Sequence, residues 1–165
     1  MAVAPFLASI LTVSDGVTAG SRKDESGAAL AELLEAQGYR VVSRRVVPDD
    51  VAEIARALEE MSVESSLVVT TGGTGFGPRD VTPEATRSII EREATGLVTL
   101  MLTEGIKATP MASLSRAVAG TRGRCLIINL PGSPRGATEN LTALLPVLPH
   151  ALTLLGGNTE HSADQ

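Results

Sequence analysis

Aromatic residues are almost missing from this chain, which contains only Phe6, Tyr39 and Phe76. The hydrophobic core must therefore be built from Leu, Val, Ile and Ala side chains. A surface that binds single-stranded nucleic acid by stacking needs several exposed rings, so we do not expect one. The net charge of −5 and the absence of any run of Lys or Arg also argue against DNA or RNA as a partner.

Cysteine occurs once, which excludes an intramolecular disulfide and a Cys-rich zinc site. Cys125 lies in an apolar run, residues 125–128, a setting typical of a buried, unreactive thiol. The first six residues have neither a basic segment nor a long apolar stretch, and no apolar run in the chain approaches the length of a membrane span. We therefore expect a cytoplasmic protein without a signal peptide or a membrane partner.

The 165 residues, 43% hydrophobic and 20% charged, suit one globular domain. We expect residues 1–155 to form this domain and residues 156–165 to be a polar, flexible tail. Short β-type runs alternate with helical patterns, and four of them predict strands: residues 6–13, 40–47, 66–71 and 124–130. Two of these runs are nearly all apolar, as in parallel strands covered on both faces. The alternation therefore predicts an α/β fold with a mostly parallel sheet between helices.

Two amphipathic helices are predicted between the first three strands. Leucines at helical spacing in residues 30–34 predict a helix that ends at Gly38 in a left-handed cap. A second apolar stripe predicts a helix over residues 51–61, with Asp49 or Asp50 placed to cap its start.

Three further helical patterns contain prolines. Residues 82–84 (TPE) have the composition of a helix start, with Thr82 as the cap and proline at the first helical position. Residues 97–119 predict a helix that is interrupted near Pro110. The leucines of residues 141–155 keep helical spacing through two prolines, which predicts either one kinked helix or two short ones.

Polar or glycine-rich loops follow all four predicted strands. These loops are residues 14–16, 48–50, 71–80 and 131–134. In an open parallel sheet the ligand lies outside the carboxyl ends of the strands. We therefore expect the four loops to share one edge of the sheet and to form the functional site.

The loop after the third strand is rich in glycine and threonine. These residues are Thr71, Gly72, Gly73, Thr74, Gly75 and Gly77. Glycine leaves backbone N–H groups open to an anion, and threonine adds hydroxyl donors. The loop lacks the Gly-Lys-Ser/Thr of a Walker A motif, and Pro78 replaces the third glycine of the dinucleotide fingerprint. A tight turn is the alternative interpretation, but the neighbouring Arg79 and Asp80 favour ligand binding.

Asp49 and Asp80 are carboxylates at predicted strand ends. As a pair facing a phosphate-binding loop they would suit Mg²⁺, which binds a few carboxylates together with phosphate oxygens. Phosphoryl and nucleotidyl transfer depend on such neutralisation of charge. The alternatives are that Asp49 caps the following helix and that Asp80 is a turn residue before Thr82.

Residues 131–135 form a second loop that could bind an anion, because it leads into a helix N-terminus, although Pro-Gly is also a general turn signal. Ser115, Arg116 and Arg122 lie in an otherwise apolar region and could reach a phosphate. The alternative is that the arginines are solvated at the surface. The two histidines have no nucleophile or metal partner in the sequence, so we assign them no role.

Residues 71–75 (TGGTG) and 78–86 (PRDVTPEAT) resemble the signature of the MogA/MoaB family of molybdenum-cofactor proteins. Residues 114–120 (LSRAVAG) and 129–134 (NLPGSP) resemble two later motifs of this family. The resemblance extends over nearly the whole chain. Gephyrin and its plant counterpart carry a similar domain.

The resemblance implies a three-layer α/β/α sandwich, the molybdopterin-binding fold, usually assembled as a homotrimer. MoaB-like members are often larger, so a hexamer is the alternative. It also implies Mg²⁺-dependent transfer of AMP from the co-substrate ATP to the terminal phosphate of molybdopterin, with release of pyrophosphate. No covalent nucleophile is needed, because a phosphate oxygen of the substrate attacks the α-phosphorus.

The resemblance also assigns roles to residues. The acidic positions that the family needs for catalysis and metal binding match Asp49 and Asp80. The predicted substrate- and phosphate-binding residues are Ser14, Asp15, Thr71, Gly72, Gly73, Thr74, Gly75, Ser115, Arg116, Pro131, Gly132 and Ser133. MoaB-like relatives commonly lack an acid at the position of Asp49, so its presence favours the adenylating branch. Some relatives carry Asn in place of Ser133.

The leading hypothesis is therefore a molybdopterin adenylyltransferase. One alternative is a MoaB-like protein that binds or transfers molybdopterin without turnover. Another is a scaffold whose trimer interface is its function, in the manner of gephyrin. The lack of an extra interaction domain in this chain argues against the scaffold.

Overall fold

A single mixed sheet forms the centre of the protein. The computed structural model describes residues 3–158. The six strands are β1 (Leu7–Val13), β2 (Arg40–Val47), β3 (Leu67–Thr71), β4 (Arg92–Glu93), β5 (Ala119–Arg122) and β6 (Cys125–Leu130). They lie in the order β2-β1-β3-β6-β5-β4. The first four strands in this order are parallel, whereas β5 pairs in antiparallel fashion with both β6 and β4.

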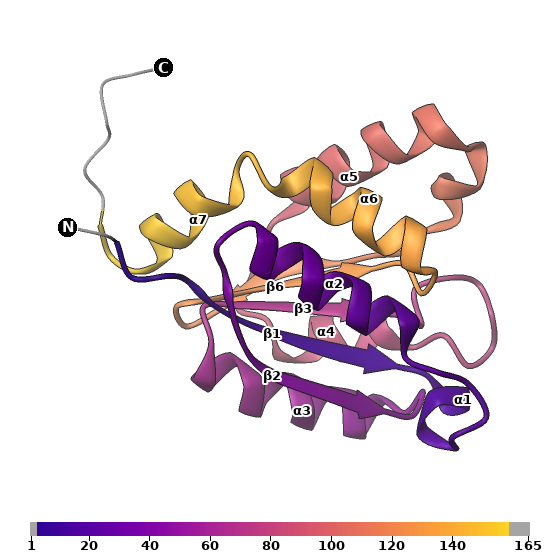
Figure 1. Ribbon diagram of the computed structural model, residues 1–165. Coiled ribbons are helices and arrows are strands. Elements are labelled where there is room, and N and C mark those ends of the chain that lie inside the picture. Colours follow the sequence, from indigo (N-terminus) through magenta and orange to yellow (C-terminus); the bar gives the residue numbers. More distant parts are fainter. Residues whose placement is uncertain (1–2, 159–165) are drawn as a thin grey trace.

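Helices cover both faces of the sheet. They are α1 (Asp15–Thr18), α2 (Glu25–Ala36), α3 (Val51–Glu64), α4 (Thr82–Ile89), α5 (Thr95–Ala108), the 3₁₀ helix η1 (Pro110–Leu114), α6 (Pro134–Leu144) and α7 (Leu148–Leu155). The helices α2, α5, α6 and α7 lie on one face, and α3 and α4 lie on the other (Figure 1). The predicted three-layer α/β/α sandwich with a mostly parallel sheet is confirmed.

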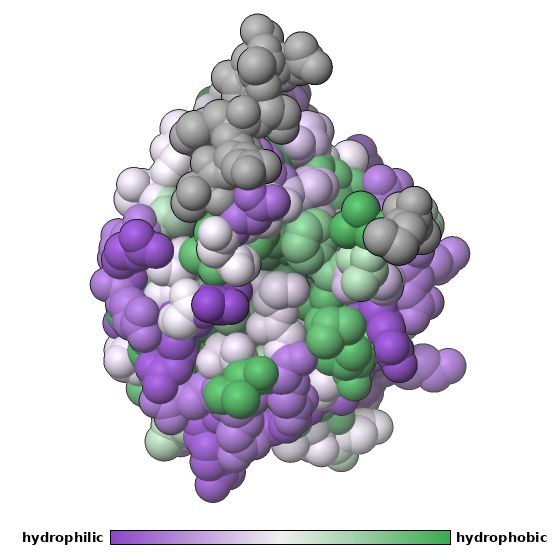
Figure 2. Space-filling model, turned by 90° about the vertical axis from the view of Figure 1, so that its left-hand side faces the viewer, coloured by the Kyte–Doolittle hydropathy of each residue, from purple (hydrophilic) through white to green (hydrophobic). Residues whose placement is uncertain are grey.

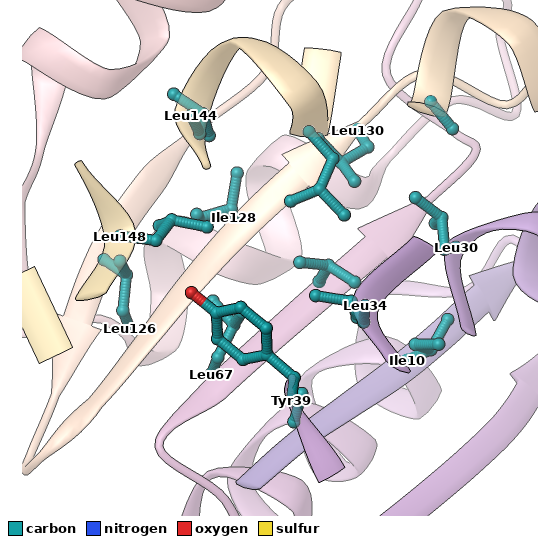
Figure 3. Close-up of a cluster of buried hydrophobic side chains, with 14 of the residues drawn as sticks. Ile10, Leu30, Leu34, Tyr39, Leu67, Leu126, Ile128, Leu130, Leu144 and Leu148 are labelled. Carbon is teal, nitrogen blue, oxygen red and sulfur yellow. The ribbon is translucent and has the colours of Figure 1, made fainter. Parts of the chain in front are cut away.

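The strands β1, β3 and β6 are buried on both faces, which explains their largely apolar sequences, whereas the edge strand β2 is mostly exposed or half-buried. On one face Ile10 and Ile128 pack in a cluster with Leu34 and Leu148 (Figure 3). On the other face the alternate residues of the same strands pack against α3 and α4. Cys125 belongs to this second cluster, and burial raises the pKa of its thiol to about 12, as expected for an unreactive cysteine.

Two of the predicted helix ends are confirmed. Gly38, with a φ of 85°, follows α2 in the left-handed conformation. Asp50 caps α3, because its side chain accepts a hydrogen bond from the backbone N–H of Glu53 at 3.0 Å. The cap of α3 is therefore Asp50 and not Asp49, which leaves the Asp49 carboxylate available for another role.

The start of α4 differs from the prediction. Its N-cap residue is Val81, and no side chain caps the helix. The buried hydroxyl of Thr82 donates instead to the carbonyl oxygen of Gly72 at 2.8 Å. The predicted capping by Thr82 is therefore wrong, because the packing of α4 against the glycine-rich loop uses this hydroxyl.

The helix predicted over residues 97–119 is interrupted near Pro110, as expected. The predicted end at residue 119 is wrong, because the helical structure ends earlier in the chain. Helix α5 stops at Ala108, η1 follows, and residues 119–122 form strand β5. Pairing of this segment with β6 overrides its helical pattern. The leucines of residues 141–155 form two short helices, α6 and α7, which is the second of the two alternatives considered.

Large apolar side chains are also exposed. Seen from the end at which α7 lies, hydrophobic residues form separate groups among hydrophilic ones (Figure 2). The exposed large apolar side chains also include Leu102 and Ile106 of α5 and Met111 and Leu114 of η1. No helix within residues 3–158 is long and apolar enough to cross a lipid bilayer. The predicted flexible tail falls largely outside the described residues and stays a prediction.

Candidate functional site

The four parallel strands end at the same edge of the sheet, and the loops that follow them gather there (Figure 1). Two hydrogen bonds connect the end of β3 and the loop after it with the end of β6 and the loop after it. Gly72 N donates to Leu130 O at 3.2 Å, and the Thr71 hydroxyl donates to Pro131 O at 2.7 Å. The structure thus brings together the loops that the sequence places at strand ends.

The backbone requires glycine at two positions of the glycine-rich loop. Gly72 (φ 101°) and Gly73 (φ 68°) lie in the left-handed region. A Cβ atom at Gly72 would lie 2.2 Å from the carbonyl oxygen of Val13, and one at Gly73 would lie 2.3 Å from the hydroxyl oxygen of Thr82. The loop therefore passes directly against β1 and α4, with no room for a side chain at either position.

Two cavities meet at this edge. The polar cavity, about 390 Å³, is lined by the polar residues Ser14, Arg22, Lys23, Glu25, Ser26, Asp49, Thr71, Asp80 and Ser133. The apolar cavity, about 510 Å³, lies between the glycine-rich loop, α5, η1 and α6, and its apolar side chains include Val98, Met101, Leu102, Met111 and Leu114. Gly73, Asp80, Gly132 and Ser133 line both cavities. The glycine-rich loop and the loop after β6 therefore form the boundary between the two cavities.

Most of the predicted site residues line at least one of these cavities. They are Ser14, Asp49, Thr71, Gly72, Gly73, Thr74, Gly75, Asp80, Ser115, Pro131, Gly132 and Ser133. Asp15 and Arg116 are not among the lining residues and instead hold lining residues in place. Sequence reasoning missed Arg22 and Lys23, which reach the polar cavity from the connection between α1 and α2. The available signal was two adjacent basic residues shortly after Asp15.

Asp15 and Asp49 are joined by a reciprocal pair of hydrogen bonds. Asp15 N donates to Asp49 Oδ2 at 2.9 Å, and Asp49 N donates to Asp15 Oδ1 at 3.0 Å. Arg79 also binds Asp15, with Nε donating to Oδ2 and Nη2 donating to Oδ1, both at 3.0 Å. The hydrogen bond from Arg79 holds the pKa of Asp15 below its ordinary value. Asp80 is held separately, because its Oδ2 accepts a hydrogen bond from Gly77 N at 2.9 Å.

The surroundings of Asp49 fit a divalent cation. Burial raises the pKa of Asp49, the negative charges of Asp15 and Asp80 raise it further, and together they outweigh the hydrogen bond from Asp15 N. A cation shared by Asp49 and Asp80 would relieve this repulsion, and carboxylate oxygens are the ligands that Mg²⁺ prefers. Within residues 3–158 no group of three or more His, Cys, Asp or Glu side chains could hold a metal ion. The remaining ligands would therefore be phosphate oxygens or water.

Arg116 clamps the glycine-rich loop. Its guanidinium donates to the carbonyl oxygens of Gly75 and Asp80, both at 2.8 Å, and forms an ion pair with Glu84. Its backbone N–H donates to Thr74 O at 2.9 Å. These contacts fix the shape of the loop, and the predicted contact of Arg116 with phosphate stays a prediction.

The loop after β6 presents a helix N-terminus at the boundary of the cavities. Ser133 caps α6 by accepting a hydrogen bond from a backbone N–H of the first turn at 3.1 Å. Gly132 packs on the glycine-rich loop, because a Cβ atom there would lie 3.3 Å from the Cα of Gly72. Arg122 lies outside both cavity linings and donates to Ile89 O at 2.8 Å, so we assign it to packing.

Known proteins have sequences similar to this one. The family model described as "Probable molybdopterin binding domain" matches residues 9–150. A molybdopterin adenylyltransferase of Helicobacter pylori is 39% identical over 153 aligned positions, which cover 90% of this chain and 87% of that protein. Gephyrin of Dictyostelium discoideum is 36% identical, and the match covers 95% of this chain but 23% of gephyrin, so this chain spans about a quarter of that relative.

A solved structure of the molybdopterin biosynthesis enzyme MoaB from Thermus thermophilus has a TM-score of 0.88 and 50% identity, covering 93% of this chain and 98% of that chain. A structure of MogA has a TM-score of 0.85 and 38% identity, covering 90% and 99% of the two chains. The resemblance inferred from the motifs is thereby confirmed. The chain belongs to the molybdopterin-binding domain family of molybdenum-cofactor biosynthesis proteins.

Proposed function

We propose that the protein transfers an adenylyl group from ATP to molybdopterin during biosynthesis of the molybdenum cofactor. The observation that carries this proposal is the meeting of two cavities at Gly73, Asp80, Gly132 and Ser133. Such a boundary would let the reacting groups of two bound substrates come together in a fixed orientation. The relatives named molybdopterin adenylyltransferase support the same reaction.

The two cavities suit different parts of the substrates. The polar cavity offers the positive charges of Arg22 and Lys23, which suit phosphate groups. The apolar cavity offers Met101, Met111 and neighbouring leucines, which suit a flat heterocyclic ring. Both ATP and molybdopterin combine such a ring with phosphate.

In the proposed reaction an oxygen of the terminal phosphate of molybdopterin forms a bond to the α-phosphorus of ATP. The bond from this phosphorus to the bridging oxygen of pyrophosphate breaks, and pyrophosphate leaves with the electron pair. A phosphate monoester is largely ionised at neutral pH, so no side chain has to act as a base. Asp49 and Asp80 would hold Mg²⁺, which supplies neutralisation of the charge on the phosphate oxygens.

The test is direct. Purified protein is mixed with ATP, Mg²⁺ and molybdopterin, and the products are separated by chromatography and identified by mass spectrometry. We expect adenylylated molybdopterin and pyrophosphate in equal amounts, and neither product when a chelator removes the metal. Tight molybdopterin binding without product would instead identify a MoaB-like binding protein and overturn the proposal.

The proposal includes assembly and location. We propose a homotrimer, with a hexamer as the alternative, in the cytoplasm. The family resemblance and the exposed apolar side chains of α5 and η1 support an assembly. No nucleic-acid or membrane partner is part of the proposal.

A further inference from the structure

Arg79 joins the glycine-rich loop to Asp15 at the start of α1. It is the neighbour of Asp80 in the glycine-rich loop, and its guanidinium donates two hydrogen bonds to Asp15, both at 3.0 Å. Asp15 in turn exchanges hydrogen bonds of 2.9 and 3.0 Å with Asp49. A continuous series of contacts therefore runs from the loop of Asp80 to Asp49.

The stability of the fold does not explain this pair. The side chains of Arg79 and Asp15 are 67% and 46% exposed, and exposed ion pairs generally contribute little to the free energy of unfolding. Neither residue is among those that line the polar or the apolar cavity. What the two parallel hydrogen bonds do provide is a fixed relative orientation of the two groups.

The positive charge of Arg79 also acts on the carboxylates. Burial raises the pKa of Asp49, the negative charges of Asp15 and Asp80 raise it further, and the positive charge of Arg79 opposes this effect. Arg79 therefore offsets part of the repulsion that Asp49 experiences from the other two carboxylates.

We propose that Arg79 is a positioning residue that acts through Asp15 to hold Asp49 where it faces the polar cavity opposite Asp80. The inference rests on the proposed adenylyl transfer. Without Arg79, the half-exposed Asp15 carboxylate can turn toward solvent, and the backbone N–H of Asp49 then loses the acceptor that helps to fix this residue. Removing residues that orient ligands in this way typically lowers activity about 10–100-fold.

The experiment compares Arg79→Met and Arg79→Lys with the control Arg87→Met. Arg87 is an exposed arginine of α4 that pairs with Glu93 at 3.6 Å, away from the cavity linings. For each variant we would measure kcat, the KM for ATP and for molybdopterin, the Tm, and the hydrogen exchange of the peptides that contain residues 14–18 and 72–82. Asp15→Asn alone and the double variant Arg79→Met with Asp15→Asn complete a mutant cycle.

We expect Arg79→Met to lower kcat about 10–100-fold, with unchanged KM values and Tm, and to speed exchange in both peptides. Arg79→Lys keeps the charge but not the paired hydrogen bonds, so it should rescue only part of kcat. The double variant should be no slower than Asp15→Asn alone, because both changes break the same link.

Three results would overturn the inference. A raised KM with unchanged kcat, or losses that add in the double variant, would mean that Arg79 contacts a substrate directly. Behaviour like that of Arg87→Met in both kcat and exchange would mean that the pair has no positioning role. If the wild-type protein formed no product, the proposed function would fail on its own. Hydrogen exchange would then still decide whether Arg79 fixes the loops.

Discussion

At the scale of single residues, Asp49 and Asp80 have different surroundings although the resemblance gives them one role. Asp49 is fixed by hydrogen bonds with Asp15 and has a pKa raised mainly by burial. Asp80 accepts one hydrogen bond from Gly77 N and borders both cavities. The charge of Asp80 is thus the one closest to the place where two substrates would meet, and we expect catalysis to depend on it most.

We predict that Asp80→Asn slows adenylyl transfer about 10²-fold or more, as for other preorganised electrostatic groups. Molybdopterin is an anion, so its affinity should be retained or slightly increased when the carboxylate charge is removed. The control is Asp50→Asn, which also removes a carboxylate but keeps a side chain that caps α3 equally well. Rates, affinities and Tm values would be measured on both variants. A lower Tm with an unchanged rate per folded molecule would show that Asp80 only stabilises its turn.

A small change at Gly75 tests whether the exact place of the Asp80 carboxylate matters. A Cβ atom at Gly75 would lie 3.0 Å from Asp80 Oδ2, so Gly75→Ala should displace the carboxylate without forcing the backbone, because this glycine has no positive φ. We predict a loss of turnover on the order of tenfold, since misplacement of reacting groups is costly. Gly96→Ala is the matched control, because a Cβ atom there meets nothing within 4 Å. Equal turnover in the two variants would argue against a placed Asp80.

At the scale of secondary-structure elements, the parallel strands were predictable and the antiparallel edge was not. The predicted strand over residues 40–47 coincides with β2, and the predictions for β1, β3 and β6 each start one residue early. β1, β3 and β6 are covered on both faces and therefore need largely apolar sequences, which stand out. β4 and β5 contain two and four residues, too few to show the alternating hydrophobic pattern of a strand. Their conformation depends on the pairing of β4 with β5 and of β5 with β6.

The site was predictable only as far as local composition reveals it. The glycine-rich loop and the two aspartates stand at strand ends, where parallel sheets bind ligands. The contacts that position them were not visible, because Arg79 bonds to a residue 64 positions away and Arg116 to one 41 positions away. Such pairings are set by the tertiary fold rather than by local sequence.

Arg116 allows a prediction about the glycine-rich loop as an element. Arg116→Met leaves the partly buried carbonyl oxygens of Gly75 and Asp80 without their donor, which should lower the free energy of unfolding by about 1–3 kcal/mol. The comparison is Arg56→Met on α3, whose exposed ion pair with Glu53 should be worth less than about 1 kcal/mol. Urea unfolding of both variants measures the difference. Equal stabilities would mean that the loop keeps its shape without the clamp.

At the scale of the whole molecule, the cavities lie at one end of the sheet, and large apolar side chains of α5 and η1 are exposed. The cavities lie at the carboxyl ends of the parallel strands, as the topology requires. The exposed apolar side chains Leu102 and Ile106 are four positions apart on α5 and so share one face of that helix. Leu102 and the exposed Met111 and Leu114 of η1 also line the apolar cavity. An interface here would place a second copy of the chain close to the site.

We predict that the protein is a homotrimer and that Ile106 lies in the interface. Light scattering at micromolar concentration should give three times the chain mass of 17.0 kDa. Ile106→Asp places a charge on the apolar face of α5 and should reduce the measured mass, because burying an unpaired carboxylate in an interface is costly. Val63→Asp on α3 is the control, since Val63 is 86% exposed and lies on the opposite side of the sheet. A stable wild-type monomer would contradict the prediction outright. Six times the chain mass would instead support the larger assembly of MoaB-like members. A trimer unaffected by Ile106→Asp would place the interface on another face.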